Sequence, residues 1–350
     1  MTRQMTGCRI TTGSRLHFGL WDVSAPFGGC GVMVDRPSTV VETRPAESFI
    51  VTGTKSPAQT QRVIDIVDRV VQRRNLDHRP PIHVHVEKVA PAHQGYGSGT
   101  QLNLAVAESI LTAIMGDGTS APMHDIVSVA DRGKRSAVGS HGYFQGGFIA
   151  ESTDRDETGI GASSTTQATL KLNPVAMRCS MPTAWRVAIC VPTARASTTE
   201  KDGDVAVAGE LEQQQFDRLP PVTDSQRVAL MEAFRGLTTS IERNDFDHFC
   251  DSLHRYNQSS GDLFAAAQGG PYNGPAATSL VHRLCASGYG GVGQTSWGPG
   301  IFVWFASEAD AQQFKLNSEF WKQESETLTV TLARPMNAPR RLETTLRPGH

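Results

Sequence analysis

The sequence predicts an α+β fold, and two patterns along the chain support that prediction. Segments that alternate between apolar and polar residues, such as IHVHVEKV at 82–89, indicate strands with one buried face. Segments in which apolar residues return every three or four positions, such as QRVIDIVDRVVQRRN at 61–75, indicate amphipathic helices. The order in which strands and helices follow one another is typical of helices that cover one face of a sheet.

The individual elements follow from the same criteria. Residues 8–41 have the composition of strands interrupted by glycine, 60–74 of a helix and 82–89 of a strand. Further along we expect an apolar helix that ends at Gly116, a helix near 122–133, a turn and then a strand within 132–151, a buried strand at 185–193, helices at 224–243, 245–257 and 275–287, a strand at 301–307, a helix at 310–323 and a last strand at 327–335.

Length and composition limit the classes of protein to consider. A chain of 350 residues is long enough for two domains, which we place at 1–180 and 181–350. With 19% charged residues and a formal net charge of -2, the chain has no basic surplus for nucleic acid, so we expect no nucleic-acid partner. No apolar run is long enough for a signal peptide or a membrane span, so we expect a cytoplasmic protein with no membrane partner. The cysteines are too dispersed for a metal pair, and we interpret them as reduced thiols.

The most informative segment is PAHQGYGSGTQLNLAVAESIL at 91–111. Its glycines at 95, 97 and 99 allow a sharp turn and a close approach of backbone to a ligand. Ser98 and Gln101 have the spacing of a capping box, which would start a helix there. The free amides of a helix N-terminus suit a phosphate or diphosphate, although a glycine turn that binds nothing has the same spacing. No lysine follows the last glycine, so the segment is not a Walker A loop.

In this loop the chain resembles the GHMP kinase superfamily, whose central motif has proline, a short spacer, glycines and serine before a long helix. Two other segments lie where that superfamily has its remaining motifs. In detail the chain is most similar to the β-ribofuranosylaminobenzene 5′-phosphate synthases, through RLHFGLWD at 15–22, FGGCGVMVDRP at 27–37, GYGSGTQLNLAVAE at 95–108, RGKRSAVGSHGYFQGGFIAE at 132–151 and GVGQTSWGP at 291–299.

The resemblance implies a fold and a reaction. The implied two-domain GHMP kinase fold has an N-terminal domain with a ribosomal-protein-like βαβ core, a ferredoxin-like C-terminal domain and a substrate cleft between them. The implied reaction, a step of methanopterin biosynthesis, joins phosphoribosyl diphosphate to 4-hydroxybenzoate or 4-aminobenzoate and releases CO2 and diphosphate. A homodimer is also implied. The alternative is an ATP-dependent GHMP small-molecule kinase, but many such kinases have an aspartate where SAVGSHGYF has His141 and no acid. A ligand-binding protein without activity is a third interpretation.

Candidate site residues follow from the anions that this reaction handles. Arginine pairs with carboxylate or phosphate in bidentate fashion, and histidine exchanges protons near neutral pH. We expect Mg²⁺ to accompany the diphosphate, with no organic cofactor. The predicted catalytic residues are Arg15, His17, Arg135 and His141, and the predicted substrate- and phosphate-binding residues are Gly95, Tyr96, Gly97, Ser98, Gly99, Thr100, Gln101, Gln294, Thr295 and Ser296.

Each of these residues also has a structural interpretation. Arg15 and His17 could simply face water from a strand, and Arg135 could answer a helix dipole. His141 could be a turn residue. Asp22 is the nearest carboxylate to the first motif, where it would orient Arg15 or hold Mg²⁺, or lie free on the surface.

Overall fold

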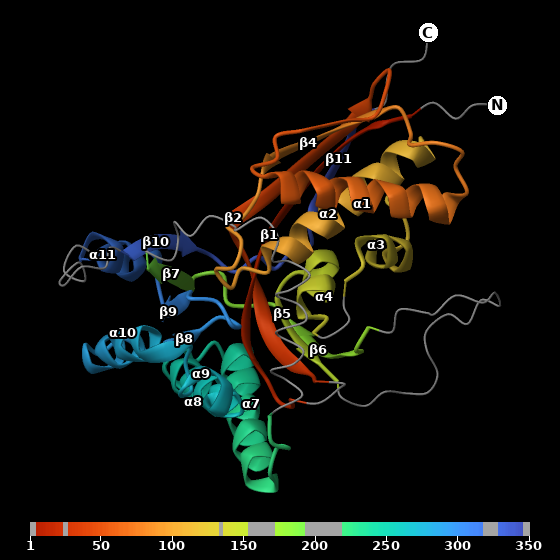
Figure 1. Cartoon of the computed structure of the whole chain (residues 1–350). Helices are drawn as coiled ribbons and strands as arrows, with labels where there is room; N and C mark the ends of the chain where they lie inside the picture. The colour runs from red at the N-terminus through yellow and green to blue at the C-terminus, as the bar shows by residue number, and fades with distance from the viewer. Residues whose placement is uncertain are drawn as a thin grey trace.

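The computed structural model describes residues 5–23, 27–132, 136–152, 172–192, 219–317 and 328–345. It confirms the predicted α+β class, with two sheets and helices packed on them (Figure 1). None of the described helices has the length and apolar character needed to cross a membrane.

The first sheet contains the two longest strands of the described chain. The order of its main path is β11-β1-β2-β4-β3, and β5 pairs with both β2 and β6. The strands predicted within 8–41 and at 82–89 are confirmed as β1, β2 and β4, whereas β3, β6 and β11 were not predicted. Their bounds are β1 (Gly7–Leu20), β2 (Gly29–Pro45), β3 (Ile50–Thr52), β4 (Ile82–Lys88), β5 (Phe148–Glu151), β6 (Val175–Cys179) and β11 (Arg341–Thr345).

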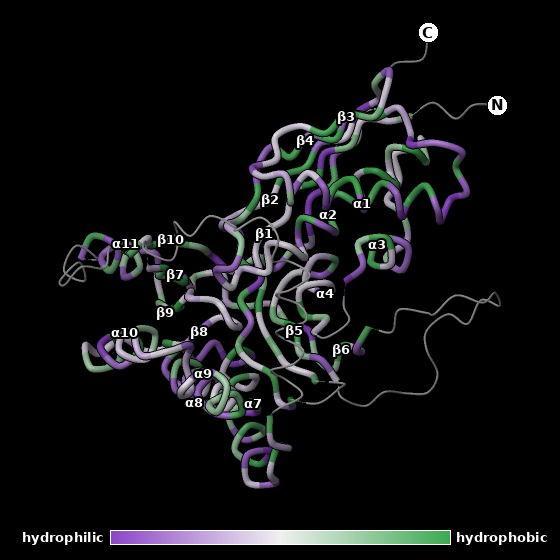
Figure 2. Tube along the Cα trace, viewed as in Figure 1, coloured by the Kyte–Doolittle hydropathy of each residue, from purple (hydrophilic) through white to green (hydrophobic). Residues whose placement is uncertain are grey.

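Helix α1 (Pro57–Arg74) shows why the helical prediction near 60–74 was correct. The Ser56 hydroxyl accepts a hydrogen bond from the Gln59 amide at its start, and Asn75 ends it in the left-handed conformation. Its apolar side chains all lie on one side, so the helix alternates between hydrophobic and hydrophilic along its length in Figure 2. The buried side joins a core with α2 and the first sheet; its members are Val63, Ile66, Val67 and Val70.

Helices α2 (Ser98–Met115), α3 (Met123–Ala130) and α4 (Val138–Gln145) complete this layer. The prediction of a simple turn before β5 was wrong, because α4 forms there. Glycine at 139 and 142 lowers the intrinsic helix propensity of this segment, so it gives no local helical signal. At the second position glycine is required by packing, since an added Cβ on Gly142 would lie 2.6 Å from the Met33 side chain of β2.

The second sheet has the strand order β10-β7-β9-β8, with all pairs antiparallel. Numbered along this half, the order is 4-1-3-2 with helices after the first and third strands, which confirms the ferredoxin-like arrangement. Its strands are β7 (Arg186–Pro192), β8 (Gly293–Gln294), β9 (Ile301–Phe305) and β10 (Leu328–Ala333), and its helices are α7 (Asp224–Arg243), α8 (Phe246–Asp262), α9 (Ala265–Gln268), α10 (Gly274–Ala286) and α11 (Glu308–Asn317).

The chain passes from the first sheet to the second between β6 and β7, near the predicted boundary at 180/181. It then returns, because β11 pairs with β1. The boundary itself stays a prediction.

The two halves are joined along the end of β1. The backbone carbonyls of residues 17–20 all accept hydrogen bonds from groups of the second half. The donors are the Ser296 amide at 3.3 Å, Asn257 Nδ2 at 2.7 Å, the Tyr256 hydroxyl at 3.0 Å and the Ser260 hydroxyl at 2.7 Å.

Candidate active site

The glycine loop before α2 is fixed against the second half of the chain. Gly95 and Gly97 have φ of +85° and +65°, a backbone conformation that is strained for residues with a side chain. A Cβ on Gly95 would lie 2.4 Å from the backbone oxygen of Thr295. The Thr295 hydroxyl donates to the Gly95 carbonyl over 2.8 Å and accepts from the His17 amide over 3.0 Å. The loop therefore lies at the junction of the two halves.

The start of α2 differs from the prediction. The capping box between Ser98 and Gln101 is wrong: Gly97 is the N-cap and no side chain caps the helix. The Gln101 side chain instead accepts from the Thr12 hydroxyl at 2.8 Å and donates to the Gly139 carbonyl at 2.9 Å. These long-range partners outcompete the local one. The first amides of an α-helix have no acceptor within the helix, so this start is suited to an anion.

Arg15 points at this helix start from β1. A Cβ on Gly97 would lie 3.2 Å from Arg15 Nε, and one on Gly139 3.6 Å from the same atom. Arg15 Nε and Nη1 are inaccessible to water and have no hydrogen-bond partner. Burial lowers the pKa of Arg15 to about 10, and the charge of Glu151 acts against that shift. Arg15 as a whole is half-buried, and guanidinium nitrogens buried without acceptors are unfavourable, so these two nitrogens are suited to an anion.

Two further arginines, which the sequence did not single out, flank the other side of the helix start. A Cβ on Gly99 would lie 3.2 Å from Arg62 Nη1 and 3.7 Å from Arg132 Nη2. Arg132 Nε is inaccessible and has no hydrogen-bond partner. Burial first, and then the charge of Arg62, lower the pKa of Arg132 to about 10. Like charges held together in this way favour an anion between them.

His17, two residues after Arg15, is 4% exposed and lies beside the same loop. Its Nε2 is 3.1 Å from the Ser136 hydroxyl. Burial, and then the charge of Arg15, lower its pKa well below the ordinary value, so the imidazole is neutral at pH 7. The structure thus brings together the predicted residues Arg15, His17 and the glycine loop.

Glu151, at the end of β5, is a buried acid that the sequence analysis missed. It is 1% exposed, and it accepts hydrogen bonds from the Ser136 hydroxyl and the Ala137 amide. Burial raises its pKa to about 7, although the hydrogen bonds and the charge of Arg15 oppose the shift. The segment SAVGSHGYF contains no carboxylate, but the fold brings one to the start of α4 from 14 residues downstream of Ala137. Glu151 is the last residue of the segment at 132–151 that carries the family resemblance, but no pattern within that segment marked it as a site residue.

Other predicted binding residues hold the loops in place. The Tyr96 side chain is buried in the core, its hydroxyl bonds with Thr331, and only its carbonyl meets the site, where it accepts from the Arg15 amide at 2.9 Å. The Gln294 side chain donates to the Ser296 carbonyl at 2.8 Å and accepts from the Asn273 amide at 2.7 Å. Ser98 is buried, Thr100 is half-buried and the Ser296 side chain is exposed. Direct contact with substrate stays a prediction for all of them.

The remaining candidates lie elsewhere or outside the described residues. His141 is on α4 and not in a turn; its Nε2 lies 2.8 Å from the Asn173 carbonyl, and burial lowers its pKa. Asp22 forms an ion pair at 2.8 Å with Arg227 rather than with Arg15. Arg135 and its neighbour Lys134 lie outside the described residues.

A protein cage for Mg²⁺ does not fit the described residues. No group of three or more histidine, cysteine, aspartate or glutamate side chains comes together among them. Both oxygens of Glu151 already accept hydrogen bonds. Mg²⁺ commonly binds substrate phosphates and keeps several waters, and the Ser98 and Thr100 hydroxyls at the start of α2 are oxygen ligands of a suitable type for that mode.

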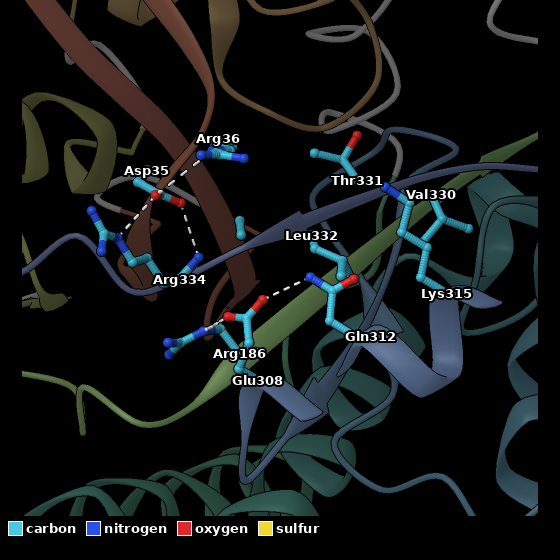
Figure 3. A pocket seen from close by; sticks show the side chains of 11 residues that line it. Asp35, Arg36, Arg186, Glu308, Gln312, Lys315, Val330, Thr331, Leu332 and Arg334 are labelled. Atoms are coloured by element: carbon cyan, nitrogen blue, oxygen red, sulfur yellow. Dashed lines mark hydrogen bonds and ion pairs between the residues drawn. The ribbon is translucent and has the colours of Figure 1, made fainter. Parts of the chain in front are cut away.

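A separate hollow of about 420 Å³ lies between β2, β7, β10 and α11 (Figure 3). Its charged residues largely pair with one another: Arg334 contacts Asp35 at 3.0 Å, and Arg186 forms an ion pair with Glu308. None of the glycine loop lines it. The hollow is thus distinct from the candidate site.

Comparison with curated proteins gives relatives over most of the chain. No family model matches it. The chain is 26% identical over 306 residues to β-ribofuranosylphenol 5′-phosphate synthase of Methanothermobacter thermautotrophicus, with 84% of this chain and 87% of that protein covered. The synthase of the same name from Archaeoglobus fulgidus is 24% identical over 330 residues, covering 92% and 95% of the two chains.

Solved structures with the same fold include two kinds of enzyme. Homoserine kinase from Cytophaga hutchinsonii matches with a TM-score of 0.65 and 16% identity, over 96% of this chain and 97% of that one. Mevalonate diphosphate decarboxylase from Enterococcus faecalis matches with a TM-score of 0.60 and 13% identity, over 97% and 100%. At these identities the likeness establishes the fold alone.

Proposed function

We propose that this chain, which has the GHMP kinase fold and is a relative of the β-ribofuranosylphenol 5′-phosphate synthases, is a decarboxylating phosphoribosyl transferase. It joins phosphoribosyl diphosphate to a para-substituted benzoate and releases CO2 and diphosphate. The observation that carries the proposal is the arrangement of arginines on both sides of the start of α2, Arg15 on one and Arg62 with Arg132 on the other.

The two arginine groups suit two different anions. The first turn of α2 with Arg62 and Arg132 offers amides, a helix dipole and two guanidinium groups, which suit the diphosphate. Arg15 is a single cation with buried, unsatisfied nitrogens, which suits the carboxylate of the benzoate until that group leaves as CO2. The site then holds the leaving group and the acceptor side by side, and this proximity is itself a large part of catalysis.

Mg²⁺ is part of the proposal as a companion of the diphosphate. Bound there, it neutralises charge that develops on the leaving group. The Ser98 and Thr100 hydroxyls are the protein oxygens that we assign to it, with the remaining positions filled by substrate and water.

The name of the relatives favours one of the two candidate acceptors. Their product is a ribofuranosylphenol phosphate, so we propose 4-hydroxybenzoate rather than 4-aminobenzoate for this chain. The competing function, phosphorylation of a small alcohol by ATP, is represented by a structural neighbour that is a homoserine kinase.

The test is turnover by the purified protein with Mg²⁺ and either phosphoribosyl diphosphate with 4-hydroxybenzoate, or ATP with homoserine. We expect CO2 and diphosphate in stoichiometric amounts from the first mixture and no ADP from the second. ADP formation without CO2 release would establish the kinase instead.

Arginine variants test the proposed binding site for the diphosphate. Arg132→Ala and Arg62→Ala each remove a charge from the diphosphate seat, so we expect KM for phosphoribosyl diphosphate to rise about tenfold or more, as for loss of a charge-assisted contact. Arg235→Ala, an exposed residue on α7, is the matched control and should leave KM unchanged. Equal KM values for all three variants would contradict the assignment of the seat.

A further inference from the structure

A row of hydrogen bonds leads from the glycine-loop junction to the buried acid. Glu151 accepts from the Ala137 amide through Oε1 and from the Ser136 hydroxyl through Oε2, the latter at 2.8 Å, and its carboxylate also accepts from the Asn173 side chain. The Ser136 oxygen lies 3.1 Å from His17 Nε2 and 3.3 Å from the Val138 amide, which donates to it. These residues come from β1 (His17), from the start of α4 (Ser136, Ala137 and Val138) and from the end of β5 (Glu151).

The donors in this row fix where the proton of His17 lies. Above its pKa of about 7 the Glu151 carboxylate is ionised and only accepts, so the single hydroxyl proton of Ser136 points to Glu151. The Ser136 oxygen must then accept from His17, which places the imidazole proton on Nε2. His17 Nδ1 is left as the unprotonated nitrogen, and no described residue hydrogen-bonds to it.

We propose that Glu151 is a positioning residue which, through Ser136, holds His17 in the tautomer whose Nδ1 takes the para-hydroxyl proton of the acceptor. This inference rests on the proposed function. It adds a group that moves a proton at the end of the acceptor opposite to its carboxylate.

The spacing on β1 agrees with this role. Arg15 and His17 are two residues apart and share a face of the strand, which separates their backbones by about 6.6 Å. That separation is comparable to the distance from the carboxylate to the hydroxyl of a para-substituted benzene ring. A benzoate whose carboxylate meets Arg15 therefore extends its hydroxyl along the strand toward His17.

The chemistry balances with this assignment. The ring carbon that bears the carboxylate forms a bond to the anomeric carbon of phosphoribosyl diphosphate. At the same time the bond between the anomeric carbon and the diphosphate oxygen breaks. The para-hydroxyl proton passes to His17 Nδ1, which makes the ring electron-rich. The carbon–carboxylate bond then breaks and CO2 leaves, its electron pair restores the aromatic ring, and the phenolate takes the proton back from His17.

We expect the isosteric variant Glu151→Gln to reverse the direction of the hydrogen bonds between residue 151, Ser136 and His17. The Ala137 amide can only donate, so we expect the amide oxygen of glutamine to take the place of Oε1 beside it and the NH2 group to donate to the Ser136 oxygen. The hydroxyl of Ser136 then donates to His17 Nε2, and the imidazole proton moves to Nδ1. Protonation of Glu151 at low pH has the same effect; the other titratable or charged groups that face it are Arg15 from β1, Cys30 from β2, Tyr256 from α8 and, through Ser136, His17.

The first measurement uses the protein alone. In ¹⁵N-histidine NMR spectra at pH 8 we expect His17 to carry its proton on Nε2 in the wild type and on Nδ1 in Glu151→Gln. Glu343→Gln, an exposed glutamate on β11, is the control and should match the wild type. A wild-type His17 protonated on Nδ1, or a tautomer that Glu151→Gln leaves unchanged, would overturn the inference whatever the enzyme's activity.

The second measurement is kinetic. We expect Glu151→Gln to lower kcat with 4-hydroxybenzoate about 100-fold, within the range for loss of a general base, and to leave KM for phosphoribosyl diphosphate unchanged. With 3-fluoro-4-hydroxybenzoate, whose hydroxyl is more acidic, the loss relative to wild type should be smaller. The wild type should also lose kcat below pH 7, and the variant should not.

The outcomes separate the two proposals. An active wild type with Glu151→Gln equally impaired on both acceptors, or not impaired, would reject the proton relay and leave the proposed function standing. A wild type inactive on both acceptors would reject the proposed function, and the NMR experiment would still decide the direction of the hydrogen bonds.

Discussion

At the scale of single residues, Glu151 is buried at a cost to the stability of the fold. Its pKa is raised from an unfolded value of about 4.5 to about 7, chiefly by burial. The folded state therefore binds a proton more tightly than the unfolded state, and stability falls as pH rises from about 4.5 through 7. Sites that need an awkwardly placed ionisable group commonly trade stability for activity in this way.

Glu151→Gln should remove this pH dependence. A shift of this size corresponds to about 3 kcal/mol between the two ends of the pH range. We expect the variant and the wild type to melt at similar temperatures near pH 4.5, and the variant to melt several degrees higher at pH 8, as followed by differential scanning calorimetry. A gap that does not change between these pH values would show that Glu151 ionises normally.

The site residues that could be predicted are those with a local pattern. Alternation along β1 put Arg15 and His17 on one face, and glycine spacing marked the loop before α2. Arg62 is on α1, Arg132 follows α3 and Glu151 ends β5. Arg132 and Glu151 are the ends of the family-like segment at 132–151, but nothing in its pattern marks them as site residues. They meet the loop only through tertiary packing, which a single sequence does not display. The capping box failed for the same reason, since Gln101 found better partners across the fold.

At the scale of elements, α2 is held by a buried ion pair at its middle. Glu108 is fully buried, pairs with Arg340 and accepts a hydrogen bond from the Tyr143 hydroxyl. Arg340 also lies over the Tyr143 and Phe144 rings. The segment that leads into β11 is therefore anchored to the helix whose first turn forms the proposed diphosphate seat.

Arg340→Ala should destabilise the protein strongly, because it leaves the Glu108 carboxylate buried without its cation. Breaking a buried pair in this way typically costs about 3 kcal/mol or more. The neighbouring Arg341→Ala removes only an exposed contact with Glu343 and should cost under about 1 kcal/mol. Urea unfolding of the two variants would measure the difference, and equal midpoints would contradict a structural role for the pair.

Elements with strong periodicity were predicted well, and those that depend on neighbours were not. Helices α1 and α7 appeared within a few residues of their predicted bounds, because each has an apolar face and a capping serine or threonine. Helix α4 contains two glycines, which give it no local helical signal. The glycine at 142 is explained only by the fold, because the Met33 side chain packs where a Cβ would lie. Strand β11, RLETT, is short and polar, and only pairing with β1 makes it a strand.

At the scale of the whole molecule, β1 belongs to both halves. It pairs with β2 and β11 in the first sheet, and its last carbonyls accept hydrogen bonds from α8 and the loop at 296. One large core extends from the first sheet across β7 and β9 to α7 and α8. The halves should therefore unfold together.

Asn257→Ala tests this coupling. Its amide donates to the Phe18 and Gln294 carbonyls and its oxygen accepts from the Gln294 amide, so the variant leaves buried backbone groups without partners. We expect a loss of about 2 kcal/mol or more and a single unfolding transition monitored by both tryptophan fluorescence and circular dichroism. The exposed neighbour Gln258→Ala should be neutral. Two separated transitions in the wild type would show that the halves unfold independently.

The pairing of β1 with β11 sets the order in which the protein can be completed during synthesis. Gly7 lies opposite Thr345, so a segment of β1 needs as its neighbour a segment that is synthesised much later. Until β11 has been synthesised, that edge of β1 presents unpaired amides and carbonyls on which another nascent chain could add a strand. Premature termination anywhere before residue 341 should consequently yield an aggregation-prone product, even when every residue of the candidate site has been made.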